Sequence, residues 1–368
     1  MNIKELILKK VLYYMQSFVI NANGTEFSVP RTEIINIEID KQYDSMIYPL
    51  WYISANVPNW FYSIITQNTE NITVSMNLQY VLAEDTDKLT MDNNYATTEV
   101  SGKFKAVVPY TTQFGDSTIQ KNISKENKTY KKNYEYNEYA YIELALYNTN
   151  AYKASFNTIN AILGNCNVSD IMTWCFNKFN IKNILLAKSD NNKRYSEFKI
   201  LPQTGTKNMM RIVDEYKFHN NGSVLFFDID RSYLVPKKPG CYAWSNNENK
   251  ITHILSLSEF DNVIGKANGV YIDNVEKYNA MVISRDSFNT QNLDGAPLIS
   301  ETGETNFLQI NTKQALISIL TPNKEFIVNI DSKDAKKYNG KYRIRTMSCT
   351  MTSKGEFLDP TFTIMLRR

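Results

Sequence analysis

Asp228 and Asp230 are the carboxylate pair with the clearest potential for chemistry in this 368-residue chain. They stand two residues apart in FFDIDRS, at the end of an apolar run, so a strand presents both on one face. Paired carboxylates of this kind bind metal ions or share acid–base work. No third ligand follows at a supporting spacing, and carboxylates at a strand end are commonly solvated. We therefore interpret the pair as a solvated strand end, with catalysis as the alternative.

The imidazole and thiol groups add little to this inventory. His219 and His253 are the two histidines, and His219 follows Asp214 and Glu215 in DEYKFH, where we expect a solvent-facing helix end. The four cysteines show no CxxC pair, which favours buried reduced thiols over a zinc site; they are Cys166, Cys175, Cys241 and Cys349. Walker, GxGxxG, GxSxG and HExxH motifs are all missing from the sequence. The sequence predicts no enzyme, no catalytic residue, no cofactor and no metal.

Composition and charge narrow the class of protein. Hydrophobic residues make up 43% of the chain and charged residues 21%, which is typical of a folded protein. The net charge of +3 argues against a surface that coats nucleic acid. Charged residues interrupt the apolar N-terminal stretch, and no later apolar run has the length of a bilayer. We expect a folded protein without a membrane span, made in the cytoplasm.

Alternation of apolar and polar residues predicts a β-rich N-terminal part. The predicted strands lie at 32–40, 45–57, 71–84, 102–111 and 140–149. Pro58 and Asn59 are typical of a helix start, and the first twenty residues fit either a short helix or an extended arm. The polar, lysine-rich stretch 113–139 is predicted to be a long exposed loop.

The next segment is predicted to form an α/β module over residues 151–236. Its first helix follows an Asn167 or Ser169 cap, and its second follows a Thr206 or Asn208 cap. The second helix places Met209, Ile212, Val213 and Tyr216 at helical spacing. An Asn-Gly turn then leads into a buried strand.

The last segment of the chain, GKYRIRTMSCTMTSKGEFLDPTFTIMLR, reads as two alternating strands around a glycine turn. In its second strand Phe362, Ile364 and Leu366 share the more apolar face, so we assign them to the core. This hairpin resembles the last hairpin of the baseplate hub proteins of contractile phage tails and related injection machines.

The resemblance covers the order of elements over most of the chain and implies the fold. It implies an α+β, mainly β protein with two tail-tube-like β-barrel domains and an inserted α/β module. Residues 1–150 then form the first barrel-type domain, residues 151–236 the inserted module, and residues 237–368 a β-rich region with the C-terminal barrel-type domain. The last strand, with Phe362, Ile364 and Leu366, closes a barrel.

The resemblance also implies a function. A bacteriophage hub is a structural, non-enzymatic homo-oligomer in the virion tail or baseplate, assembled in the host cytoplasm. It links the tail tube to the central spike and forms part of the genome-delivery channel. The implied partners are further copies of the chain in a homotrimer, the tail tube protein, the central spike and the baseplate wedge proteins. DNA passes through without specific binding, which the near-neutral charge suits.

Two other functions stay open on the sequence. The Tyr/Asn-rich loop 113–139 could bind a receptor or cell-wall carbohydrate, because tyrosine offers a stacking face and a hydroxyl group. A hydrolase acting through Asp228 and Asp230 is the remaining alternative.

Overall fold

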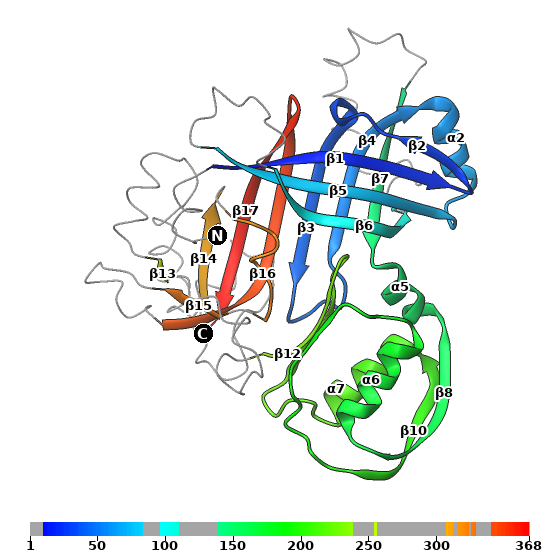
Figure 1. Ribbon diagram of the computed structural model, residues 1–368, viewed down its shortest axis with the longest axis vertical. Helices are drawn as coiled ribbons and strands as arrows, with labels where there is room; N and C mark the ends of the chain where they lie inside the picture. Colours follow the sequence, from blue (N-terminus) through cyan, green and yellow to red (C-terminus); the bar gives the residue numbers. More distant parts are fainter. Residues whose placement is uncertain are drawn as a thin grey trace, which may run out of the picture.

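The computed structural model describes residues 10–83, 96–109, 139–237, 254–255, 307–312, 315–323, 325–328 and 340–367. These residues are the coloured part of Figure 1. The predicted loop 113–139 lies outside them except for Tyr139. None of the helices in these ranges has the length and apolar character needed to cross a membrane.

Eight antiparallel strands close into a barrel. In order around the ring they are β3 (Ile34–Gln42), β4 (Leu50–Pro58), β7 (Tyr139–Tyr147), β6 (Thr97–Val107), β5 (Ile72–Ala83), β1 (Lys10–Ala22), β17 (Phe357–Arg367) and β16 (Gly340–Lys354). The ring is complete because β16 pairs with β17 on one side and with β3 on the other. From Lys10 onward, the N-terminal stretch is therefore extended and belongs to the barrel.

The hairpin of β16 and β17 reaches beyond the barrel. Its turn contains Gly355 at φ +68°, a left-handed conformation that glycine adopts without strain. The end of β16 farthest from this turn, residues 340–343, pairs with β15 (Glu325–Val328), and β15 pairs with β13 (Ile254–Leu255). The end of β17 farthest from the turn, residues 362–367, pairs with β14 (Phe307–Thr312). One long hairpin thus belongs both to the barrel and to the strands beside it.

The predicted α+β, mainly β fold with a β-barrel is confirmed. The closed barrel takes six strands, β1 and β3 to β7, from the range 1–150, and β16 and β17 from the range 237–368. The two outer ranges therefore cooperate in one barrel among the described residues. A second barrel and the division into three domains stay predictions.

The inserted module contains three helices and two small sheets. Its elements are α5 (Thr149–Phe156), β8 (Thr158–Cys166), α6 (Val168–Lys178), β9 (Ile184–Leu186), β10 (Tyr195–Thr204), α7 (Gly205–Glu215), β11 (Ser223–Phe227) and β12 (Ser232–Pro236). Strands β8 and β10 form a two-stranded ribbon, and β11, β12 and β9 form a three-stranded sheet. Figure 1 shows the ribbon on the side of the module away from the barrel.

Local sequence explains where the two longer helices of the module begin. Asn167 caps α6 in a capping box with Asp170, one of the two predicted caps. Helix α7 follows Thr204, so neither Thr206 nor Asn208 is its cap. A side chain at Gly205 would meet the Phe179 ring at 2.0 Å, so a close approach requires glycine there. The buried Asn208 amide instead binds the backbone at Leu201 and Gln203.

Helix α2 (Asn59–Gln67) closes one end of the barrel. It begins directly after Pro58, the last residue of β4, as the sequence predicts. Phe61 and Ile65 are fully buried and belong to the barrel core. The module lies at the opposite end of β4, which starts at Leu50 (Figure 1).

Candidate functional site: the joint between barrel and module

One sheet of the module separates two hydrophobic cores. Every residue of β11 and β12 is buried, so both faces of this sheet are covered. Alternate residues point to opposite sides. Val224, Phe226, Tyr233 and Val235 belong to the barrel core, whereas Leu225, Phe227 and Leu234 belong to the module core. The sheet therefore ends one core and begins the next.

A buried ion pair crosses this boundary. Lys41 continues the inward-facing series of Ile37 and Ile39 on β3 and is 1% exposed. It binds Asp228, which directly follows β11 and is 2% exposed. Trp51 Nε1 donates to Asp228 Oδ1 at 3.3 Å, and the backbone N–H of Ile229 donates to the same oxygen at 2.9 Å. We call Lys41, Asp228 and the barrel-facing residues of β11 and β12 the joint.

The joint corrects the interpretation of the aspartate pair. Asp228 is no solvated strand end, because it is buried and paired with Lys41. Asp230 is partly buried in the turn between β11 and β12, so the two residues do not share a strand face. Burial, together with the nearby charge of Asp228, raises the pKa of Asp230. Within the described ranges, no group of three His, Cys, Asp or Glu residues could hold a metal ion.

A short irregular segment, residues 315–323, helps to close the same end of the barrel. Ala315, Leu316, Ile317 and Leu320 belong to the barrel core. Barrel side chains bind its backbone: the N–H of Ile317 donates to the Tyr13 hydroxyl at 3.2 Å, and the Tyr43 hydroxyl donates to the Leu320 carbonyl at 2.8 Å.

Glu99 adds a buried carboxylate to these contacts. It accepts from the N–H of Ser318 at 2.7 Å and from the Ser318 hydroxyl at 3.0 Å. Burial raises the pKa of Glu99 above the ordinary value for a glutamate. The segment is thus attached by polar contacts as well as by apolar packing.

Three arginines of the hairpin of β16 and β17 make polar contacts with residues outside the hairpin. Arg343 Nη1 donates to the carbonyl oxygen of Pro236 at 2.8 Å, at the end of β12. Arg367 Nη1 lies 2.9 Å from Asp44 Oδ2, and Arg345 Nε lies 3.2 Å from the same oxygen. Arg367 also donates to the carbonyl of Lys237 at 2.6 Å. The last strands of the barrel therefore contact the chain where it leaves the module.

The structure separates the predicted cluster at the end of α7. Asp214 and Glu215 are exposed, as expected, but His219 is only 1% exposed. Its Nδ1 lies 2.8 Å from the Ser223 hydroxyl, and its Nε2 lies 3.2 Å from the Lys188 carbonyl. Burial lowers the pKa of His219 to about 4. The expectation of a solvent-facing histidine is wrong.

Three of the four cysteines are buried free thiols, as predicted: Cys166, Cys175 and Cys349. Burial raises the pKa of Cys175 to about 12, so this thiol is held in its protonated, unreactive form. Cys241 lies outside the described residues.

The structure buries the three residues assigned to the barrel-closing strand. Phe362, Ile364 and Leu366 all belong to the barrel core. Their strand, β17, pairs with β16 along its length and meets β1 where Tyr13 lies opposite Leu358.

Sequence reasoning missed three buried charged residues, namely Lys41 and Glu99 of the barrel and Arg343 on the part of β16 that pairs with β15. For Lys41 a signal was present, because it occupies the inward phase of the alternation Ile37, Ile39, Lys41. An inward-facing lysine in a strand calls for a buried partner. The sequence alone did not identify that partner, which lies 187 positions further along the chain.

Packed side chains enclose both the ion pair and the barrel interior. Asp228 is neutralised by Lys41 and sealed from solvent, so it is not accessible to a substrate. Eight strands enclose an interior just wide enough for side chains or one small ligand, and aromatic and aliphatic side chains fill this one. The site is a joint between two packed cores.

The fold thus defines a closed eight-stranded barrel that carries an inserted α/β module on a buried joint. The chain belongs to the family described as Bacteriophage PBS1 gene 109 protein, whose model matches residues 3–254. This match confirms the kinship with phage proteins predicted from the sequence. A search of curated proteins finds no match.

Solved structures give distant likenesses. The 43 kDa tail protein of prophage MuSo2 from Shewanella oneidensis has 10% identity and a TM-score of 0.42, covering 95% of this chain and 97% of its own. The E. coli c3393 protein, a type VI secretion component, has 10% identity and a TM-score of 0.41, covering 96% and 76%. The Francisella PdpA–VgrG complex in its half-lidded form has 10% identity and a TM-score of 0.49, covering 98% and 58%.

Proposed function

We propose that this chain is a structural component of a phage tail, placed in the baseplate hub between the tail tube and the central spike. The observation that carries the proposal is the joint, which makes barrel and module share one sheet and one buried ion pair. A subunit built this way transmits force without bending between its parts. Membership of a phage protein family supports the setting.

The filled interior of the barrel constrains the path of the DNA. Side chains occupy the interior, helix α2 closes one end, and the joint with segment 315–323 closes the other. DNA therefore runs outside each barrel, through a channel that several copies surround. A homotrimer in which copies stand side by side around the channel meets this requirement. The tail tube protein, the central spike and the baseplate wedge proteins are the proposed neighbours.

The other two functions receive less support. The Tyr/Asn-rich loop proposed to bind a receptor or carbohydrate lies outside the described residues except for Tyr139, so that function stays a prediction. The hydrolase proposal relied on two accessible carboxylates, and Asp228 is buried in an ion pair.

A complementation experiment tests the proposal. A phage whose copy of this gene is interrupted receives a tagged chain from a plasmid, and purified particles are examined by electron microscopy and immunogold labelling. We expect the tag at the head-distal end of the tail tube, and we expect no complete tails without the chain. Infectious particles that lack the protein would overturn the proposal.

A further inference from the structure

The outer surface of the barrel carries an acidic wall on three adjacent strands, β3, β4 and β7. We define the acidic wall by Glu38, Asp40, Tyr52, Tyr141 and Glu143, which all lie on the outward phase of their strands; Ser54 has the same phase but is only 3% exposed. Pairing brings Glu38 beside Tyr52 and Ser54 beside Glu143. None of the outward positions of these three strands is occupied by Lys or Arg.

The acidic wall is ordered by its own contacts. The Tyr141 hydroxyl lies 2.9 Å from Ser54 Oγ and 3.3 Å from Glu143 Oε2. Burial raises the pKa of Glu143, and the negative charge of Glu38 adds to this effect. A cation brought to this surface would relieve that repulsion. Tyrosine side chains beside the carboxylates are the kind of residue that anchors protein interfaces.

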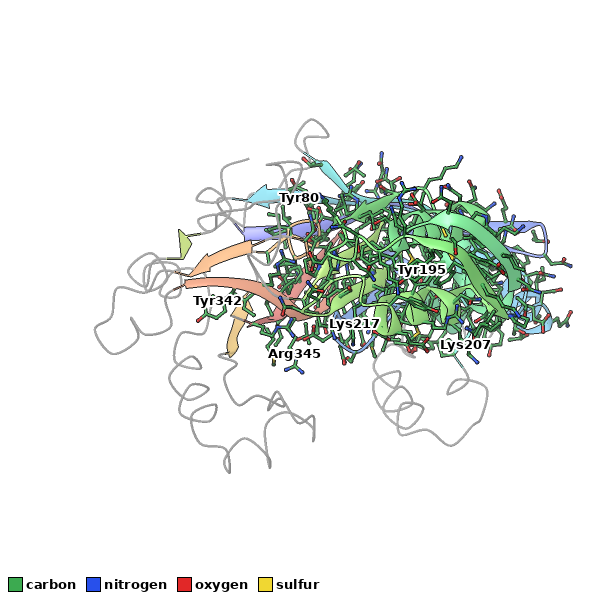
Figure 2. The ribbon with its side chains drawn as sticks, turned by 90° about the horizontal axis from the view of Figure 1, so that it is seen from below. Tyr80, Tyr195, Lys207, Lys217, Tyr342 and Arg345 are labelled. Atoms are coloured by element: carbon green, nitrogen blue, oxygen red, sulfur yellow. The ribbon has the colours of Figure 1, made fainter. Side chains whose placement is uncertain are left out.

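The exposed charge of the module has the opposite sign. Its exposed basic residues are Lys153, Lys178, Lys182, Lys188, Lys193, Arg194, Lys199, Lys207, Lys217 and Arg231, and its exposed acidic residues are Asp170, Glu197, Asp214 and Glu215. Figure 2, seen from the side of the module, labels Lys207 and Lys217 among them.

The ribbon of β8 and β10 combines this charge with an apolar side chain. Ile162 is 63% exposed and lies opposite Lys199 in the antiparallel register. Lys193 and Arg194 stand exposed just before β10, and Glu197 shares the outer face as a single acidic residue. We define the basic ribbon as Ile162, Lys193, Arg194 and Lys199.

We propose that the acidic wall of one copy receives the basic ribbon of the next copy, an interface that rests on the proposed function as a ring subunit. The occupant follows from charge complementarity between two surfaces of the same chain. The joint fixes the module on its barrel, with the ribbon on the far side of the module (Figure 1). Different surfaces meeting head to tail are what closes identical subunits into a ring.

Charge reversal in purified full-length chains tests the interface. The wall variant is Glu38→Lys with Glu143→Lys, and the ribbon variant is Lys193→Glu, Arg194→Glu and Lys199→Glu. In each variant the wall and the ribbon carry charge of the same sign, so each variant alone should be monomeric in sedimentation velocity. A mixture of the two should form a complex of one-to-one composition, because the two intact surfaces complement each other and so do the two reversed surfaces. Absence of that complex, while the wild-type chain associates, would overturn the proposal.

Particle assembly separates this inference from the proposed function. In the complementation assay we expect each variant to enter tails at least about tenfold less than wild type, because like charges then face each other. Combining both sets of reversals should restore entry. The control, Glu26→Lys with Glu356→Lys, reverses exposed carboxylates outside both surfaces and should enter normally.

The results of these experiments separate the interface proposal from the proposed hub function. Normal entry of the wall variant would overturn the interface and leave the hub function standing, whereas absence of the wild-type chain from tails would overturn the hub function itself. The proposal would also be overturned if the ribbon variant lost binding to duplex DNA and the combined variant did not restore entry into tails. The basic ribbon would then be assigned to nucleic acid. Unchanged thermal melting of each variant shows that folding is intact.

Discussion

The two ends of the barrel are closed in different ways. At one end α2 inserts Phe61 and Ile65, and Phe27 packs on Phe61 with ring centroids 5.2 Å apart. At the other end the module and residues 315–323 are held by Lys41, Glu99 and other polar groups as well as by apolar packing. Apolar packing is non-directional, whereas a buried charge is stable with its partner in one place. The joint is therefore where the geometry of the two parts is specified.

The largest expected effect comes from breaking the ion pair on one side. Lys41→Met leaves Asp228 buried without a counter-charge, which should lower the free energy of unfolding by about 3–5 kcal/mol. Urea unfolding at neutral pH measures the loss.

The double variant Lys41→Met with Asp228→Leu sharpens this result. Removing both charges should recover most of the lost stability. If the ion pair orients the module, the double variant should be stable but enter particles poorly. A single variant as stable as wild type would contradict the buried pair.

His219 tests a buried polar group of the module outside the joint. Its folded pKa of about 4 lies below the unfolded value of about 6.5, so the folded state binds fewer protons. This contribution to stability is present above about pH 6.5 and is lost as the pH falls towards 4, by about 3 kcal/mol.

Urea unfolding across this pH range measures the loss, with His219→Gln as the control. The wild type should lose stability relative to the variant as the solution becomes more acidic. Parallel pH profiles for the two proteins would show that the imidazole is solvated.

The apolar end should respond weakly to a small change. Ile65→Val removes one methylene from a fully buried side chain and should cost about 1 kcal/mol. Thermal unfolding followed by circular dichroism measures it. A loss as large as that of Lys41→Met would remove the contrast between the two ends.

The smallest effect on stability is expected at Glu99, where the direction of the change in stability with pH is informative. A carboxyl group with a raised folded pKa contributes stability at low pH that is lost as the pH rises through that pKa. Glu99→Gln should therefore gain stability relative to wild type as the pH rises towards neutrality. The difference between their urea midpoints measures this gain, and a falling difference would indicate that the charged form is the better-bound one.

Much of the fold was predictable because the strands alternate cleanly. The strands predicted at 32–40, 71–84 and 140–149 correspond to β3, β5 and β7, and Phe362, Ile364 and Leu366 of the last strand lie in the barrel core. These predictions depend on neighbours along the chain, which the sequence displays directly.

The joint was not predictable from local pattern, because its partners are distant in sequence. The run VLFFDID signals burial but does not say that alternate residues enter two different cores. The same run made Asp228 read as a solvated strand end, although the lysine it needs lies on β3. Such sites depend on contacts between residues that are distant in the sequence. The periodicity of apolar residues carries no information about these contacts.

The closure of the barrel by β16 and β17 has a consequence for biosynthesis. A ribosome completes β1 to β7 well before it makes the two strands that join β3 to β1. Until then the edges of β3 and β1 are open to pairing with other chains. Contacts between strands so far apart in sequence form slowly, because a long loop must close first. The nascent chain thus passes through a stage at which aggregation competes with folding, and chaperone demand should be highest just before the terminal hairpin emerges.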